Sequence, residues 1–279
     1  MSSISEGGVA VITGAAGGLG LGIAKAAALR GMSVVLSDID VDRLDESVSA
    51  LEAMGLSTSA KQADVSNPEG MIQLAESVVD EHGRVDLACL NAGISPVALP
   101  IGEIPREVWK RVLDINLYGV VNGIEAFLPL MEKQGSGHIN ATASVNGLMA
   151  DPEIAPYNAS KFAAVGVMES LHVELLRTGS PIEASVLCPG PIATDIIKRA
   201  IGDDRGKSAE EHDLLNRGMS PDEAGQITID GIANGRFWIF THELMISETL
   251  RTRFEEMAAA GARPGELDWP WDRILNSNG

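Results

Sequence analysis

The fold is decided by a stretch near the amino terminus, VAVITGAAGGLG, which spans residues 9–20. Its first part, Val9–Thr13, is an apolar run that leads into glycines, which is typical of a strand buried on both faces. The apolar residues after the glycines recur at helical spacing and predict a helix that is closed by Gly31. Glycines in such a turn let backbone N–H groups approach a pyrophosphate at the positive end of the helix. Any tight turn can require glycine, so the glycine cluster alone is a weak signal. Its position between a buried strand and a helix is what favours phosphate binding.

Strands and helices alternate through the rest of the chain. Further strands are expected at residues 34–36, 58–62, 85–90, 138–143, 182–187 and 237–240, and further helices at 41–54, 68–83, 106–133, 157–177, 221–234 and 243–260, the one at 106–133 being broken near Gly119 and Gly123. This alternation predicts a parallel sheet covered by helices on both faces. We therefore expect one α/β domain of the Rossmann type, with a doubly wound, parallel, seven-stranded sheet, over residues 1–260. It includes a substrate loop at about 189–220, and a tail follows at 261–279.

A carboxylate ends the second predicted strand. Asp38 stands about 20 residues beyond the glycine loop, where an acid accepts hydrogen bonds from the adenosine ribose of a dinucleotide. A carboxylate there would repel the 2′-phosphate of NADP, and neither the glycine loop nor Ile39 supplies a basic side chain. NAD is therefore the expected cofactor, and a cap on the next turn is the alternative role for Asp38.

Composition argues against several classes of function. The chain has 21 basic and 39 acidic residues and a formal charge of −18, which disfavours nucleic acids and anionic membranes as partners. No apolar stretch approaches the ~20 residues that span a bilayer, and the first residues lack the pattern of a secretory signal, so a cytoplasmic protein is expected. Cys89 and Cys188 each lie in an apolar run and are expected to be buried, reduced thiols.

Neither a metal centre nor a hydrolase triad is expected. The five histidines are scattered, and the sequence contains no H-E-x-x-H or C-x-x-C pattern. A G-x-S-x-G elbow is also absent from the sequence.

Tyr157 and Lys161 lie one turn apart on the same face of a predicted helix. An ammonium group beside a phenol stabilises the phenolate, so a tyrosine whose pKa is ordinarily about 10 could act nearer neutrality. Alone, this spacing usually means two exposed helix residues. Here Ser144 closes the preceding strand, at the end where sheets of this type bind ligands.

Together these residues resemble the short-chain dehydrogenase/reductase family, from roughly Val9 to Ile192. The family's motifs match, in order, Thr13, Gly14, Gly18 and Gly20 in the glycine loop, Asp64-Val65, Asn91-Ala92-Gly93, Asn116, Ser144, Tyr157 with Lys161, and Pro189-Gly190 with Thr194. The resemblance implies that the cofactor is bound by Gly14, Gly18, Leu19, Gly20, Asp38, Asp64, Val65, Asn91, Gly93, Tyr157, Lys161, Pro189, Gly190 and Thr194.

The resemblance also implies a mechanism. Tyr157 acts as the general base in alcohol oxidation and as the general acid in ketone reduction. Ser144 stabilises charge that develops on the substrate oxygen. Lys161 holds the nicotinamide ribose and favours the phenolate, and Asn116 orders a water that extends the proton relay from Lys161 to solvent.

The substrate is predicted from the composition of the segments that the resemblance places around the pocket. These segments supply Leu148, Met149, Ile154, Ile94, Ile196 and Ile197, with Asp151 and Glu153 nearby. We expect a mid-sized, largely apolar secondary alcohol or ketone that is uncharged or cationic.

Family members are often homodimers or homotetramers that pack the helices of Asn116 and Tyr157 together, although an apolar helix face could equally belong to the core. The long helical ending after Thr241 departs from the short, glycine-rich end of many family members, and it could close the pocket, cover a partner subunit or be flexible. The alternative functions are an NADP-dependent carbonyl reductase and a non-catalytic dinucleotide sensor, although sensors typically lose the tyrosine or the lysine.

Overall fold

The computed structural model describes residues 4–196, 200 and 218–259. Most of the predicted loop at 189–220 and the whole tail at 261–279 lie outside these residues. So does Ile197.

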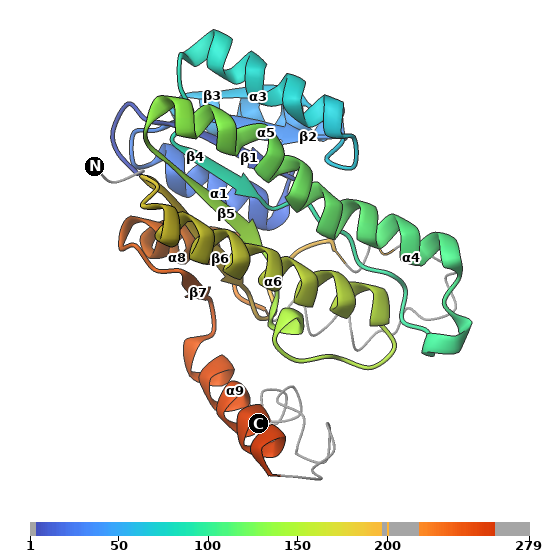
Figure 1. Ribbon diagram of the computed structural model, residues 1–279. Coiled ribbons are helices and arrows are strands. Elements are labelled where there is room, and N and C mark those ends of the chain that lie inside the picture. Colours follow the sequence, from blue (N-terminus) through green and yellow to red (C-terminus); the bar gives the residue numbers. More distant parts are fainter. Residues whose placement is uncertain (1–3, 197–199, 201–217, 260–279) are drawn as a thin grey trace.

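A parallel seven-stranded sheet forms the centre of the described part of the chain (Figure 1). Its strands are β1 (Val9–Thr13), β2 (Ser33–Asp38), β3 (Thr58–Gln62), β4 (Leu87–Leu90), β5 (Gly137–Thr142), β6 (Ile182–Cys188) and β7 (Trp238–Phe240). They lie in the order β3-β2-β1-β4-β5-β6-β7. The chain therefore runs outward from β1 in both directions, and the switch point lies between β1 and β4, as the doubly wound prediction requires.

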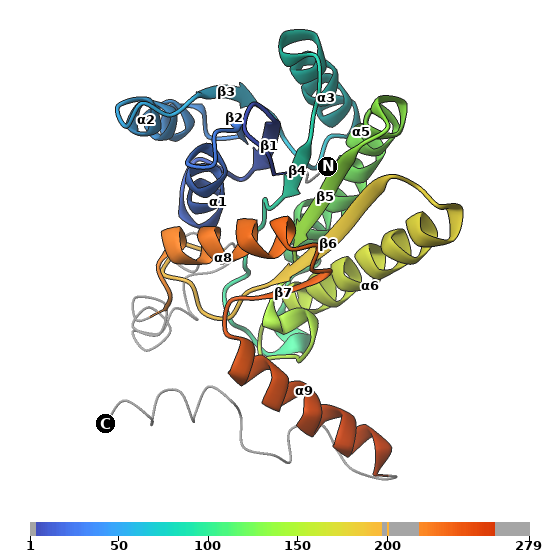
Figure 2. The same cartoon turned by 90° about the vertical axis from the view of Figure 1, so that its left-hand side faces the viewer.

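Helices cover both faces of the sheet (Figure 2). Their bounds are α1 (Gly18–Ala28), α2 (Val41–Glu52), α3 (Pro68–His82), α4 (Arg106–Leu113), α5 (Gly119–Gln134), α6 (Ala155–Thr178), α8 (Pro221–Ala233) and α9 (Glu243–Ala258), with short turns η1 (Ile101–Glu103), η2 (Asp114–Tyr118) and η3 (Val145–Gly147). Side chains of α1, α2 and α8 form one apolar core with the sheet, and those of α3, α5 and α6 form another on the opposite face. In both views α9 extends away from the sheet (Figures 1 and 2).

Glycine permits the close crossing of α1 and α8. A Cβ atom on Gly22 would overlap the carbonyl oxygen of Pro221, and one on Gly225 would overlap the backbone of Gly22. The two helices therefore touch backbone to backbone, which no larger residue allows.

The predicted helix at 106–133 differs in one respect. Its irregularity is η2, a π-helical turn between α4 and α5, while α5 continues through Gly123. Gly123 is needed for another reason, because a Cβ there would overlap the side chain of Leu90 on β4. The glycine marks close packing of the helix on the sheet and does not mark a break.

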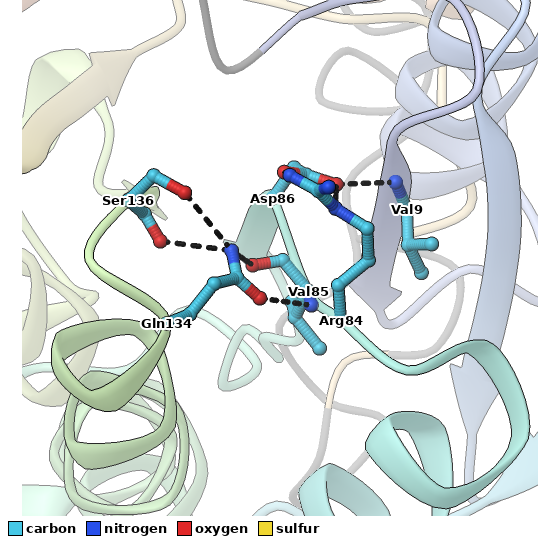
Figure 3. A network of polar contacts seen from close by, with 6 residues as sticks. All are labelled: Val9, Arg84, Val85, Asp86, Gln134 and Ser136. Carbon is cyan, nitrogen blue, oxygen red and sulfur yellow. Dashed lines mark hydrogen bonds and ion pairs between the residues drawn. The ribbon is translucent and has the colours of Figure 1, made fainter.

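The amino-terminal end of β4 is fixed by side chains (Figure 3). The buried Asp86 carboxylate accepts hydrogen bonds from the N–H of Val9, at 2.8 Å, and from the Arg84 guanidinium. Gln134 pairs with both the N–H and the carbonyl of Val85, at 3.1 Å each, in place of a neighbouring strand. This is why β4 begins at Leu87 and not at the predicted Val85.

No helix among the described residues combines the length and the apolar character that crossing a bilayer requires.

Candidate active site

One cavity of about 930 Å³ opens at the carboxyl ends of the strands. Every residue predicted for the site lines it, with the exception of Asn116. Because Gly14 and Tyr157 are far apart in the sequence, this assembly is a product of the topology, which brings the ends of β1, β2, β4, β5 and β6 to one edge of the sheet.

The glycine loop is built for close backbone approach. Gly14 has a φ of +67°, and a Cβ there would lie 2.7 Å from the Cα of Ala92. The amide of Asn91 donates to the carbonyl of Thr13 at 3.0 Å and accepts from Thr142 at 3.1 Å, which ties together the ends of β1, β4 and β5. Asn91 therefore lines the cavity and also fixes the strand ends that border it.

Helix α1 begins at this loop without a side-chain cap. Its N-cap residue is Gly17, and its first turn contains no acidic residue. The N–H groups at its start border the cavity with no side-chain acceptor, and such a helix end attracts an anion.

Asp38 is held against the same loop. One carboxylate oxygen accepts from the N–H of Ala16 at 3.1 Å, and the other accepts from the N–H of Asp40 at 3.1 Å. These bonds fix a negative charge at the cavity wall, at the place where an adenosine ribose is expected. Asp64 lies further along the wall, where its carboxylate accepts from Ser66.

A basic residue also reaches the loop. Arg43, in the first turn of α2, places its Nη2 atom 2.6 Å from where a Cβ on Gly17 would stand. The same atom lies 3.9 Å from the carboxylate of Asp195, which also lines the cavity. Arg43 lies outside the glycine loop and does not directly follow Asp38, so the motif pattern gave no indication of this cation.

Lys161 and Tyr157 share the first turns of α6. The Lys161 ammonium lies 5.6 Å from the centre of the Tyr157 ring and donates to the carbonyl of Thr142 at 2.8 Å. Only 3% of the Lys161 residue is exposed, and this burial lowers its pKa to about 8. Burial raises the pKa of the Tyr157 phenol above its usual value, a hydrogen bond with Ser144 opposes that rise, and the charge of Asp151 adds to it.

Ser144 caps the short turn η3 directly after β5. Its hydroxyl accepts from the N–H of Asn146 at 3.1 Å and donates to the Asn146 side chain at 3.2 Å. The amide of Asn146 in turn donates to Asp151 at 2.7 Å and to Asn158 at 3.2 Å. Asn146 and Asn158, which the motif spacing did not single out, therefore connect Ser144 to the far wall of the cavity.

Asn116 lies in the π-helical turn η2 and is completely buried. Its side chain accepts from the N–H of Ile94 at 2.8 Å and donates to the Ile94 carbonyl at 2.9 Å and to Ser160 at 3.1 Å. Asn116 therefore fixes the backbone of the segment after Gly93 without lining the cavity itself. A single π turn inside a helix is often found at functional sites, since it reorients one side chain.

The wall opposite the glycine loop is mixed in character. Ile94, Ile154 and Ile196 line the cavity together with Asp151 and Glu153, as predicted. Leu148 packs against the core instead, and Met149 is not among the lining residues.

Comparison with known proteins identifies the family. A family model described as short chain dehydrogenase matches residues 8–204. The chain belongs to the short-chain dehydrogenase family. It is 32% identical over 271 residues to the 1-deoxy-11-beta-hydroxypentalenate dehydrogenase of Streptomyces exfoliatus, and the alignment covers 94% of each chain.

Solved structures agree with this assignment. A short-chain dehydrogenase/reductase of Burkholderia phymatum in complex with NAD superposes with a TM-score of 0.87 at 31% identity, covering 96% of this chain and 100% of the other. An alcohol dehydrogenase of Thermococcus sibiricus complexed with 5-hydroxy-NADP gives a TM-score of 0.71 at 26% identity, covering 84% and 95%. The protein is an oxidoreductase of this family with the family's single-domain fold. Among the described residues, no group of three or more His, Cys, Asp or Glu side chains is placed to hold a metal ion.

Proposed function

We propose that this protein is an NAD(H)-dependent dehydrogenase that transfers a hydride between the nicotinamide and a secondary alcohol or ketone. The observation that carries the proposal is that Tyr157, Lys161 and Ser144 line the same cavity as the glycine loop. A proton-transferring phenol and an anion-binding helix end are the two parts that such a reaction requires.

The chain's own residues fit a dinucleotide. The uncapped start of α1 would receive the pyrophosphate, and Gly14 and Gly18, both with positive φ, keep the loop free of side chains. Thr194 lies beside Gly18, where a Cβ would stand 3.2 Å from the threonine methyl group. Asp64 and Val65 would border the adenine, and Pro189, Gly190 and Thr194 the nicotinamide end.

A bound nicotinamide supplies the hydride acceptor or donor. Tyr157, as the phenolate, takes the hydroxyl proton of the alcohol in oxidation and returns it to the carbonyl oxygen in reduction. Ser144 donates a hydrogen bond to the substrate oxygen and stabilises charge developing on it. Lys161 would hold the nicotinamide ribose, and Asn116 supports the segment through which a water would connect Lys161 to solvent. The expectation that Lys161 brings the pKa of the phenol nearer neutrality is not met by this geometry, because burial raises the pKa of Tyr157 and lowers that of Lys161 to about 8.

NAD is preferred over NADP in this proposal because the Asp38 carboxylate is fixed by the N–H groups of Ala16 and Asp40 at the ribose position. A charge held by two hydrogen bonds does not easily move away from a 2′-phosphate. The alternative, an NADP-dependent carbonyl reductase, gains support from Arg43, which lies near the same wall. The presence of both Tyr157 and Lys161 argues against a non-catalytic sensor.

The substrate class follows from the far wall. Three isoleucines, Ile94, Ile154 and Ile196, favour a mid-sized apolar body, and the acids Asp151 and Glu153 disfavour an anionic one. The name of the Streptomyces relative describes a dehydrogenase of a hydroxylated carboxylate, so it supports the alcohol chemistry and does not support the exclusion of anionic substrates.

We further propose a homodimer or homotetramer formed through α5 and α6. Val173 and Leu176 on α6 are 44% and 68% exposed, and Tyr118 just before α5 is 55% exposed. Exposed apolar side chains of this kind are what a second copy of the chain would cover. Light scattering on the purified protein measures the mass directly, and a monomeric mass at micromolar concentration would contradict this part of the proposal.

The test is nicotinamide reduction over a panel of secondary alcohols, run in parallel with NAD and NADP. The proposal predicts reduction of NAD with apolar, mid-sized alcohols. Activity with NADP alone would contradict the role given to Asp38. Strong preference for a small dicarboxylate or a phosphorylated sugar would contradict the substrate class.

A further inference from the structure

The chain leaves β7 through two polar residues, Thr241 and His242, that contact the cavity wall without lining the cavity. The Thr241 hydroxyl is 3.0 Å from the backbone nitrogen of Gly190, whose N–H it accepts, and 2.7 Å from Nδ1 of His242. The imidazole packs directly on Gly190, because a Cβ there would stand 2.6 Å from Nδ1. Both side chains therefore act on Gly190, which lines the cavity in the turn after β6.

The other side of this turn is bonded to the segment of Ser144. The carbonyl of Pro189 accepts from the N–H of Val145 at 2.9 Å, and Val145 directly follows Ser144. The Pro189-Gly190 turn is thus bonded on one side to Val145 and on the other to Thr241. A change at Thr241 would shift the turn relative to Ser144.

A neutral imidazole fits the hydrogen bonds around Thr241. The hydroxyl accepts from Gly190 and has one proton left to donate, which Nδ1 of His242 can accept when the ring proton is on Nε2. An imidazolium would instead donate from Nδ1 to the same hydroxyl oxygen. The hydroxyl proton would then lose its acceptor, in a threonine that is only 6% exposed. The neutral form of His242 therefore completes the chain of hydrogen bonds that begins at Gly190.

The surroundings of His242 favour this neutral form. Burial lowers the pKa of the imidazole below its usual value, because a charged ring loses solvation there. The carboxylate of Glu223 on α8 opposes the effect with its negative charge, and the neighbouring Glu243 on α9 is exposed. His242 is therefore neutral at pH 7 and becomes charged only in acid.

We propose that Thr241 and His242 are positioning residues for the nicotinamide, and that they act through the Pro189-Gly190 turn. The inference rests on the proposed dinucleotide-dependent function, in which this turn borders the nicotinamide end of the cofactor. It deepens that function by giving a role to the Thr241-His242 sequence, which departs from the glycine-rich ending of many family members. Neither residue contacts the reacting atoms.

The test measures the dissociation constants of NADH and of ADP-ribose by calorimetry, for the wild type and for Thr241→Val. ADP-ribose lacks only the nicotinamide ring. Loss of the acceptor for Gly190 predicts roughly three- to tenfold weaker NADH binding and unchanged ADP-ribose binding. Thr241→Ser keeps the hydroxyl and should bind NADH as the wild type does.

Thr228→Val is the matched control for loss of a buried threonine hydroxyl. Thr228 lies on α8, is completely buried, donates to the carbonyl of Ala224 at 2.7 Å and does not line the cavity. Its substitution should leave the affinities for both ligands unchanged.

The pH dependence of NADH binding separates a positioning role from a purely structural one. In the wild type, affinity should fall as the pH drops through the pKa of His242, since protonation takes away the acceptor of the Thr241 hydroxyl. His242→Asn keeps an acceptor that does not titrate, so this loss in acid should disappear. His242→Leu keeps no acceptor and should bind NADH several-fold more weakly than the wild type at pH 7.

Equal NADH affinities of the wild type and Thr241→Val would overturn the inference alone. Equal weakening of NADH and ADP-ribose would also overturn it, because the effect would then not involve the nicotinamide. The same loss of affinity in acid for the wild type and His242→Asn would remove His242 from the pair. If the wild-type protein binds neither NADH nor NADPH, the proposed function fails as well.

Discussion

The ammonium group of Lys161 lies 5.6 Å from the centre of the Tyr157 ring, one helical turn away on α6. It is held there by a 2.8 Å hydrogen bond to the carbonyl of Thr142. Burial disfavours the charged form of this lysine, whose pKa falls from 10.5 to about 8. The site thus maintains a cation beside the phenol at a cost in folding free energy.

Replacing Lys161 with Met should therefore stabilise the protein. Between pH 8 and 10.5 the unfolded chain binds more protons than the folded one at this residue, so the stability of the wild type rises with pH there and the cost is fully present below pH 8. At pH 7 we expect Lys161→Met to raise the free energy of unfolding by roughly 1–3 kcal/mol, after deduction of the lost hydrogen bond. Urea unfolding of the wild type and the variant measures this difference in the free energy of unfolding.

The gain should shrink as the pH rises from 8 toward 10.5. Lys110→Met is the control, because Lys110 is exposed and pairs with Asp114, and it should bring no such gain. A Lys161→Met variant with a lower free energy of unfolding than the wild type at pH 7 would contradict this, because the buried ammonium would then stabilise the fold.

The pH dependence of alcohol oxidation should report the ionisation of Tyr157. Burial and the charge of Asp151 hold the pKa of the phenol above its usual value, so the phenolate form that oxidation needs accumulates only at alkaline pH. Oxidation should therefore accelerate, and ketone reduction should slow, as the pH rises through that range. The measurement is kcat/KM against pH in both directions.

Two variants should move this profile in opposite senses. Asp151→Asn removes a charge that raises the phenol pKa, so its oxidation limb should shift to lower pH. Ser144→Ala removes the hydrogen bond that lowers the pKa, so the remaining activity should shift to higher pH. Shifts in the same direction would show that these residues do not act through the Tyr157 ionisation.

The crossing of α1 and α8 should tolerate no side chain at Gly22. Gly22→Ala forces Cβ against the carbonyl of Pro221, and backbone atoms cannot move aside as a side-chain end can. We expect a loss of about 1–3 kcal/mol or more in thermal or urea unfolding. Gly166→Ala on α6, where a Cβ meets no atom within 4 Å, should instead stabilise by about 0.5–1 kcal/mol. Equal effects of the two substitutions would contradict this packing.

Helix α9 is tied to the catalytic segment through Arg253. Its guanidinium donates to the carbonyl of Leu148 at 2.7 Å and lies 5.0 Å from the centre of the Phe162 ring. Leu148 follows η3, and Phe162 follows Lys161. The segment between Leu148 and Ile154 shapes the substrate wall, so Arg253→Met should raise KM for the alcohol several-fold. This corresponds to a loss of binding free energy on the order of 1 kcal/mol. The affinity for the dinucleotide should be unchanged. The exposed Arg251→Met should change neither quantity, and an unaltered KM in Arg253→Met would leave α9 without a role at the site.

Motifs in the sequence predicted most of the fold and many of the residues that line the cavity. β1 begins and ends where the apolar pattern places it, because a strand buried on both faces in a parallel sheet carries an unbroken apolar signal. β3 also has the predicted bounds, although it is the edge strand and none of its residues is buried. Many of the predicted site residues lie at turns after strands, and the parallel sheet brings those turns to one edge. Tyr157 and Lys161 lie instead in the first turns of α6, and Asn116 lies in η2.

The features that the sequence did not predict depend on contacts between side chains that are distant in the sequence. Val85 has a strand-like sequence but is bonded by Gln134, which is distant in the sequence. Gly123 looks like a helix breaker until the neighbouring Leu90 is known. Arg43 reaches the glycine loop only because α2 begins at Val41 and points its third residue inward, and no local pattern encodes that direction.

The central claim is that Tyr157 transfers the substrate proton while the dinucleotide carries the hydride. The most direct measurement is single-turnover reduction of NAD by the best alcohol of the panel, in wild type and in Tyr157→Phe, alongside the dissociation constant of NADH for each. The account predicts a loss of at least about 10²-fold in the rate, with unchanged NADH affinity, since the substitution removes only the proton-transferring hydroxyl. A Tyr157→Phe variant that reduces NAD at the wild-type rate would contradict it.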